Sequence, residues 1–289
     1  MVEVGDLLLA LYGATSGDIA ICKINGAINQ AILCIRTEQN TKFIESIWRK
    51  HVGKLCQTYL QGGQGNLSAD IVKNISFYFP RIKEQKKLAE FISLLDERIA
   101  TQNKIIEKLE TLIKGIAQNI VRSNRPNVRL SECFECSSST LQESDVCEHG
   151  SYPVYGANGI VGYLDNYNTE NEAVYIIKDG SGVGAVSYVA GKCSATGTLN
   201  TLQAKKGYSL QYLYYMLKVF NFEPYKTGMA IPHIYFKDYG KAQIFCPAYT
   251  EQLRYARLLS TIDNKLFTEH NILADLSLQK QYLLRQMFI

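Results

Sequence analysis

Four side chains with metal-binding chemistry lie close together near the middle of this 289-residue sequence. Cys133 and Cys136 are separated by two residues, and Cys147 and His149 follow with one residue between them. Thiolate and imidazole ligands at short spacings are typical of zinc sites. The second pair is too close for relaxed tetrahedral coordination. We therefore favour unpaired structural cysteines and keep a zinc-dependent enzyme as an alternative.

Other catalytic patterns are missing from the sequence. Gly180, Gly182 and Gly184 are spaced like part of a dinucleotide-binding loop, but a strand rather than a helix is expected after them. Lys192 follows a glycine without the rest of a phosphate-binding loop. There is no H-E-x-x-H, no G-x-S-x-G and no Asn/Asp-Pro-Pro-aromatic tetrapeptide of an amino-methyltransferase. These absences favour a recognition module without cofactors over an enzyme.

Polar side chains are concentrated in glycine-rich loops. Asn and Gln can form paired hydrogen bonds to adenine, and small residues let a loop approach a groove closely. Each such residue has an alternative role in a turn or a helix cap. The candidate DNA-contacting residues are Tyr12, Thr15, Ser16, Asn29, Gln30, Gln64 and Asn66 in the first half, and Tyr155, Asn158, Lys178, Asp179, Ser181, Lys192, Thr196, Thr198, Asn200 and His233 in the second.

The net charge is only +4 at pH 7, but it is unevenly distributed. Residues 128–177 are strongly acidic, whereas 178–247 are basic. A phosphate-facing surface is therefore expected from the later segment. A solvated surface position explains each lysine equally well, so charge alone does not establish DNA binding.

The eight cysteines and the first residues both favour a cytoplasmic protein. Without secretory features, eight cysteines indicate reduced thiols. The N-terminal residues lack the basic segment of a signal peptide, and no run approaches the ~18 apolar residues of a membrane span.

A block of sequence recurs at an offset of 167 residues. The pattern P-x-x-x-E-Q begins at Pro80 and again at Pro247, after an apolar, strand-like run in each case. A repeat on this scale predicts two similar units, each a globular segment followed by a helix. Internal two-fold symmetry suits duplex DNA, a partner that is itself nearly two-fold symmetric.

Each repeated block opens a long segment with heptad periodicity. In 88–120 and again in 255–287, apolar residues recur at alternating spacings of three and four, as in a coiled-coil seam. Gln102, the polar residue of the first seam, aligns with Glu269 in the second. We expect two antiparallel helices that cross near these residues. An ordinary amphipathic helix on a globular core is the alternative.

The globular segments are predicted to be β-rich with one helix each. The matching strands are expected at 6–12 and 19–24, and at 173–177 and 185–189; the matching helices are expected at 42–54 and 209–220. Residue 1 aligns with residue 168, while the second globular segment begins near 127. The first unit therefore lacks a counterpart of about 40 residues.

The sequence resembles the specificity subunit of a type I restriction–modification system. The resemblance covers nearly the whole chain and depends on Y-P-V-Y-G-A-N-G-I-V-G-Y at 152–163, G-D-L-L-L-A-L-Y-G-A-T-S-G at 5–17, A-I-N-Q at 27–30 and the repeated P-x-x-x-E-Q. It implies two target-recognition domains, each for one half of a split DNA site. Two conserved antiparallel helices would act as spacer. It implies no enzymatic activity. The partners would be two DNA adenine methyltransferase subunits and a restriction/translocase subunit.

The expected fold is α+β, with two β-rich α/β target-recognition domains separated by an antiparallel coiled coil of two long helices. We expect a shortened first recognition domain at 1–80, a spacer helix at 81–123, a second recognition domain at 124–247 and a second spacer helix at 248–289. A shortened first domain departs from the family pattern, in which this domain is complete. Recognition of the first half-site by this domain is therefore open.

A scaffold protein without DNA specificity is the alternative from another functional class. Its coiled coil would drive assembly, and its glycine-rich domains would bind proteins. The helices also leave open self-association of two copies.

Overall fold

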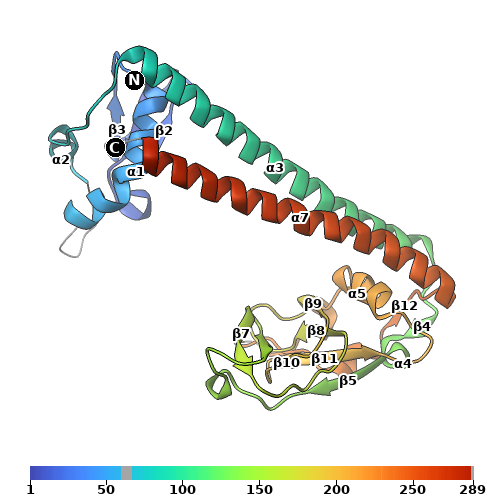
Figure 1. Ribbon diagram of the computed structural model, residues 1–289. Helices are drawn as coiled ribbons and strands as arrows, with labels where there is room; N and C mark the ends of the chain where they lie inside the picture. The colour runs from blue at the N-terminus through green and yellow to red at the C-terminus, as the bar shows by residue number, and fades with distance from the viewer. Residues whose placement is uncertain (60–66, 229, 288–289) are drawn as a thin grey trace. The chain divides into compact units, whose positions relative to one another are not determined.

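The computed structural model describes residues 1–59, 67–228 and 230–287. The chain forms two compact units. Unit 1 comprises Met1–Ile106 and Thr268–Ile289, and unit 2 comprises Glu107–Phe267. The two long helices, α3 (Ile82–Ser123) and α7 (Tyr249–Met287), each contribute one half to each unit (Figure 1).

Helices α3 and α7 pack against each other in antiparallel orientation, as predicted. In unit 1 the Gln102 amide donates to the Glu269 backbone carbonyl over 2.9 Å and to the Glu269 carboxylate. Both side chains are buried. Farther along the pair, Asp96 accepts a hydrogen bond from Lys280. From Glu269 to Lys280 on α7, the partner on α3 changes from Gln102 back to Asp96, as in antiparallel helices. The expected crossing of the two polar seam residues is confirmed.

Unit 2 is built on an antiparallel sheet with the strand order β5-β11-β8-β9. Its strands are β5 (Phe134–Ser138), β8 (Ala173–Ile177), β9 (Val186–Val189) and β11 (Leu199–Ala204). Helix α5 (Leu210–Lys218) packs against β8, β9 and β11. Alternation along β8 directs Val174 and Ile176 into the same core as α5, while Tyr175 lies in a second core.

That second core is shared with a smaller sheet of order β10-β6-β7. Its strands are β6 (Tyr152–Gly156), β7 (Gly159–Leu164) and β10 (Ser194–Ala195). The remaining elements of unit 2 are β4 (Val128–Arg129), which pairs with β12 (Gln243–Ile244), and the short helices α4 (Leu130–Cys133), η2 (Glu143–Asp145), η3 (Glu223–Tyr225) and α6 (Phe236–Tyr239).

Unit 1 repeats the central part of this arrangement. Its sheet has the order β2-β1-β3, with β1 (Leu7–Ala10), β2 (Ile19–Ile21) and β3 (Ile32–Ile35). These strands stand 167 positions before β8, β9 and β11. The helical elements are η1 (Gly13–Thr15), α1 (Thr41–Tyr59) and α2 (Ala69–Lys73). Among the described residues of unit 1 there are no counterparts of β4 to β7, as the alignment predicts.

The glutamine of the repeated P-x-x-x-E-Q pattern has the same structural role in both units. Gln252 is 2% exposed; its amide donates to the Pro247 carbonyl over 2.9 Å, and its side-chain oxygen accepts from the Ser209 N–H over 2.8 Å. Gln85 makes the matching bonds to the Pro80 carbonyl and the Asn40 N–H. In each unit the buried glutamine ties the start of the long helix to the residue just before the sheet-covering helix.

None of the helices among the described residues combines the length and the apolar character needed to cross a membrane.

Candidate nucleic-acid interface

Several loops of unit 2 meet at one end of the larger sheet. The Lys178 N–H, at the end of β8, donates to the Thr198 carbonyl over 3.0 Å. The Ile234 N–H donates to the Lys178 carbonyl over 2.9 Å, and the Gly180 N–H donates to the Pro232 carbonyl over 3.0 Å. These bonds join the turn after β8, the segment before β11 and the loop 227–233.

The loop 227–233 is closed by reciprocal backbone hydrogen bonds. Thr227 and His233 exchange N–H to carbonyl bonds of 2.9 and 2.7 Å. Gly228 has φ +88°, and a Cβ at this position would lie 2.3 Å from the Ile231 carbonyl oxygen. Only glycine fits this backbone without strain. The Ile231 side chain is 57% exposed at the surface.

The His233 side chain is held by the neighbouring turn. Its Nδ1 lies 2.7 Å from Asp179 Oδ1. Its ring lies beside Tyr235, with centroids 6.4 Å apart and planes at 27°. Lys237 places its Nζ 5.3 Å from the centroid of the Tyr235 ring. Sequence reasoning missed Tyr235 as a member of this group; the available signal was an aromatic residue two positions after a loop histidine.

We call His233, Asp179, Tyr235 and Lys237 the His233 cluster; the backbone of Lys178 is bonded to Ile234 beside it. The cluster combines an imidazole, a carboxylate, a phenol and one ammonium group, contributed by the turn after β8, the segment around His233 and α6. This chemistry suits hydrogen bonding to base edges and attraction to phosphates.

Four predicted contact residues have mainly internal roles. Thr196 and Asn200 are buried. The Thr196 hydroxyl is 2.8 Å from that of Thr198, and Asn200 bonds Ser138 and Tyr239. Burial raises the pKa of the Tyr155 hydroxyl. The backbone carbonyl of Tyr155 accepts a hydrogen bond from the Thr196 N–H. These side chains support the loops from inside the unit.

The remaining candidates of unit 2 are dispersed. Ser181 is exposed in the turn after β8. Asn158 is exposed between β6 and β7, in the smaller sheet. Lys192 lies over Tyr167, with Nζ 4.8 Å from the ring centroid. Asn158 and Lys192 therefore lie outside the His233 cluster.

Unit 1 places its candidates in the corresponding loops. Tyr12 and Thr15 are exposed at the turn after β1, and the Ser16 hydroxyl donates to the Leu11 carbonyl over 2.9 Å. Asn29 caps the start of β3 by accepting from the Ala31 N–H, and Gln30 is exposed beside it. Gln64 and Asn66 lie outside the described residues.

One backbone contact recurs between the units. The Leu67 N–H donates to the Leu11 carbonyl over 2.8 Å. Both residues stand 167 positions before Ile234 and Lys178, which make the same bond in unit 2. The same backbone connection is thus present in both units.

The cysteines and His149 do not form a metal site in the part of the chain that the structure describes, where no group of three metal-ligating side chains is found. Cys133 is buried, and its hydrogen bond with Cys246 together with burial raises its pKa. Cys136 lies on β5, and Cys147 is exposed. The four residues are neighbours in sequence rather than in one coordination sphere.

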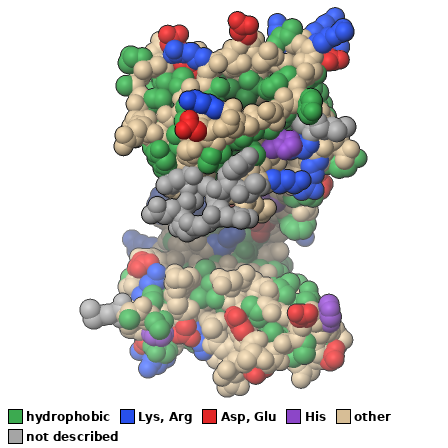
Figure 2. Space-filling model, turned by 90° about the vertical axis from the view of Figure 1, so that its left-hand side faces the viewer, with side chains coloured by type: hydrophobic (Ala, Val, Ile, Leu, Met, Phe, Trp, Pro, Cys, Tyr) green, Lys and Arg blue, Asp and Glu red, His purple; other side chains and the backbone are tan. Residues whose placement is uncertain are grey.

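The surface charges are mixed in sign. On the face drawn in Figure 2, basic and acidic side chains are scattered among uncharged polar ones, without a continuous basic field. This matches the net charge of +4. A nucleic-acid partner would be recognised here mainly through hydrogen bonds, with modest electrostatic attraction.

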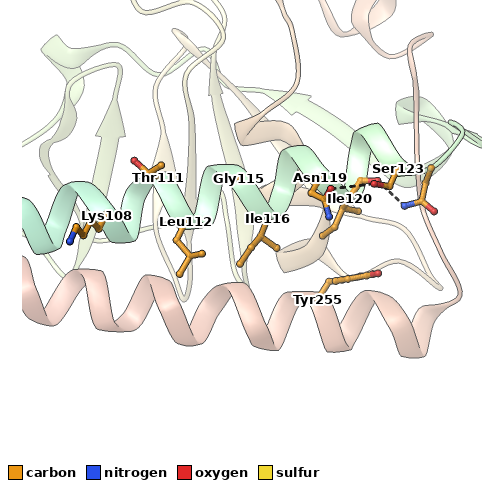
Figure 3. A pocket seen from close by; sticks show the side chains of 10 residues that line it. Lys108, Thr111, Leu112, Gly115, Ile116, Asn119, Ile120, Ser123 and Tyr255 are labelled. Carbon is orange, nitrogen blue, oxygen red and sulfur yellow. Dashed lines mark hydrogen bonds between the residues drawn. The ribbon is translucent and has the colours of Figure 1, made fainter.

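A groove lies between α3 and α7 within unit 2 (Figure 3). Leu112, Ile116 and Ile120 line it from α3 and Tyr255 from α7. Gly115 leaves room between the apolar side chains, because no heavy atom lies within 4 Å of its absent Cβ. The polar residues Lys108, Thr111, Asn119, Ser123 and Asn124 also line the groove. A groove with apolar side chains and a polar rim is suited to bind another protein.

Comparison with known proteins reveals one family. Residues 2–111 and 124–278 match the type I restriction modification DNA specificity domain. The type I restriction enzyme MjaVIII specificity subunit of Methanocaldococcus jannaschii is 28% identical over 125 residues, which cover 42% of this chain and 29% of that protein. A putative type I specificity subunit of Mycoplasma genitalium is 24% identical over 247 residues, 77% of this chain and 64% of that one. These matches span less than two thirds of the relatives' own length.

The fold has a counterpart among solved structures. The crystal structure of a type I restriction-modification system S subunit from M. genitalium superposes with a TM-score of 0.71 at 18% identity, covering 100% of this chain and 84% of that one. The likeness confirms the predicted α+β fold with two domains and paired long helices.

Proposed function

This chain belongs to the type I restriction modification DNA specificity domain family, and from that premise we propose that it is a non-catalytic DNA sequence-recognition subunit. Each recognition domain contacts one half of a bipartite duplex target. The observation that carries the proposal is the repeated architecture: two sheets with equivalent strands 167 positions apart carry polar loops joined by the same backbone bond.

The proposed division of the chain follows the helices. Residues 1–80 and 124–247 are the recognition domains, and 81–123 and 248–289 are the spacer helices. The shortened first domain contacts its half-site through the loops near Tyr12 and Asn29. The second domain contacts its half-site through the His233 cluster and the nearby Ser181.

The proposed protein partners supply the chemistry. Two DNA adenine methyltransferase subunits bind the helices, and the groove at Leu112, Ile116 and Tyr255 is the candidate docking surface in unit 2. A restriction/translocase subunit completes the assembly. Methylation and cleavage belong to these subunits.

The proposal is tested by co-expression with the methyltransferase encoded beside it, followed by co-purification and genome-wide mapping of methylated adenines. We expect a stable complex and one split recognition motif. A chain that binds no methyltransferase, or a complex whose methylation shows no bipartite motif, refutes the proposal.

A salt series separates this proposal from the scaffold alternative. Phosphate contacts make DNA affinity fall with rising salt concentration, because cations condensed on the duplex are released on binding. A protein scaffold has no such dependence.

A further inference from the structure

The His233–Asp179 pair defines the hydrogen-bonding state of one exposed ring. An ionised carboxylate only accepts hydrogen bonds, so His233 Nδ1 carries the proton in the 2.7 Å contact with Asp179 Oδ1. In the neutral imidazole the other nitrogen, Nε2, then has a free lone pair and acts as an acceptor. No hydrogen bond to Nε2 occurs within the described part of the chain.

The ring is also fixed in orientation. His233 is bonded to Thr227 through both backbone groups, and its side chain lies beside Tyr235. Gly228 lies against the ring: a Cβ there would be 3.0 Å from His233 Cδ2. The ring is therefore preorganised, because Asp179 bonds one edge, Tyr235 stacks on one face and the backbone is bonded to Thr227. The His233 side chain is still 34% exposed. Preorganised groups lose little entropy on binding.

An acceptor at this position discriminates among bases. In the major groove adenine and cytosine offer amino donors, whereas guanine and thymine offer acceptors at N7, O6 and O4. A lone pair on Nε2 accepts a hydrogen bond from the amino group of adenine or cytosine. Opposite the acceptor atoms of guanine or thymine it is left unsatisfied or repelled.

We propose that His233 is a specificity-determining residue of the second recognition domain, whose Nε2 accepts from the exocyclic amino group of one adenine or cytosine in its half-site. Asp179 is a positioning residue that selects the accepting tautomer. This inference depends on the proposed function and adds to it a base class, a residue and an atom.

The test compares methylomes of the full-length chain in complex with its methyltransferase. We expect His233→Ala to make one adenine- or cytosine-specific position of one half-site degenerate, with discrimination there reduced about 5- to 100-fold. The other half-site stays unchanged. His233→Phe keeps the ring and its stacking on Tyr235 but lacks the acceptor, so it gives the same degeneracy if the alanine variant folds poorly.

Asp179→Asn provides a second readout. An amide can donate to or accept from Nδ1, so both tautomers become accessible. The same single position then loses its preference for an amino group. A merely structural defect would weaken methylation at every site without changing the motif. His149→Ala, an exposed histidine of the same unit outside the cluster, is the matched control and leaves the motif intact.

Two outcomes overturn the inference in distinguishable ways. A bipartite wild-type motif that stays identical in His233→Ala and His233→Phe, including uniformly slower methylation, overturns the role of His233 alone. A wild-type complex without any bipartite motif overturns the proposed function and this inference with it.

Discussion

Replacing Gln252 by leucine removes two hydrogen bonds where α7 begins beside α5. Gln252 is 2% exposed and bonds the Ser209 N–H at 2.8 Å and the Pro247 carbonyl at 2.9 Å. Leucine fills a similar volume but satisfies neither group. A buried polar group without its partner costs about 1–3 kcal/mol, which gives about 2–6 kcal/mol for the two groups.

The burial of the leucine side chain offsets part of this loss in the free energy of unfolding. One or two additional apolar carbons contribute about 1 kcal/mol. We therefore expect Gln252→Leu to lower the free energy of unfolding by about 1–5 kcal/mol. The Ser209 amide should also exchange hydrogen faster, because its acceptor is gone.

Urea unfolding followed by circular dichroism measures the first effect, and hydrogen exchange resolved at Ser209 measures the second. If the units unfold separately, the shift belongs to the transition of unit 2. Gln281→Leu, at an exposed position of the same helix, is the matched control and should change stability by less than about 0.5 kcal/mol. A loss from Gln252→Leu no larger than that of the control refutes the argument that the repeated glutamine ties the helices together.

Three further predictions concern charge, backbone and DNA. Burial raises the pKa of Asp96, but hydrogen bonds from Lys280 and Lys42 outweigh this effect, so the folded pKa lies below the ordinary value of 3.8. The stability that this shift provides is present above pH 3.8 and is lost as the pH falls through the folded pKa. Asp96→Asn should lack this pH-dependent stability, which unfolding measured across pH will show. Gly228→Ala should destabilise the loop 227–233 by about 1–3 kcal/mol, detected as faster amide exchange at His233, and an unchanged rate would contradict the geometry. Lys178→Ala should reduce the slope of log affinity against log salt by about 1 in DNA titrations, and an unchanged slope removes Lys178 from the phosphate contacts.

The helical part of the fold was predictable because its signals are periodic and local. Seam residues recur every three or four positions, and Gln102, the one polar residue of the first seam, could be paired with Glu269 of the second from the offset alone. The structure places them in contact. The positions of β1, β2, β8 and β9 were also predictable, because these strands of unit 1 coincide with those of unit 2 after the offset.

The candidate site was less predictable, because turn-forming and base-contacting residues are of the same types. Thr196 precedes β11 and Asn200 lies on that strand, but the side chains of both are buried. Tyr235 became part of the cluster only through its stacking on His233. The cysteine spacing likewise suggested a metal site, although Cys133 contacts Cys246, more than a hundred residues away. Burial and long-range pairing are tertiary properties that spacing does not determine.

The contact between Gln102 and Glu269 also shows why the glutamate of the second repeat does not suit both copies of this position. The residues occupy the same place in each repeat and touch each other, so in an exact repeat this position would face a copy of itself. Two glutamates would bring two carboxylates together in a buried seam, and like charges at such a distance are strongly unfavourable. One glutamine and one glutamate instead supply a donor to an acceptor. Divergence of the repeat is therefore useful where the two helices cross, whereas Gln85 and Gln252, which contact only their own units, remain identical.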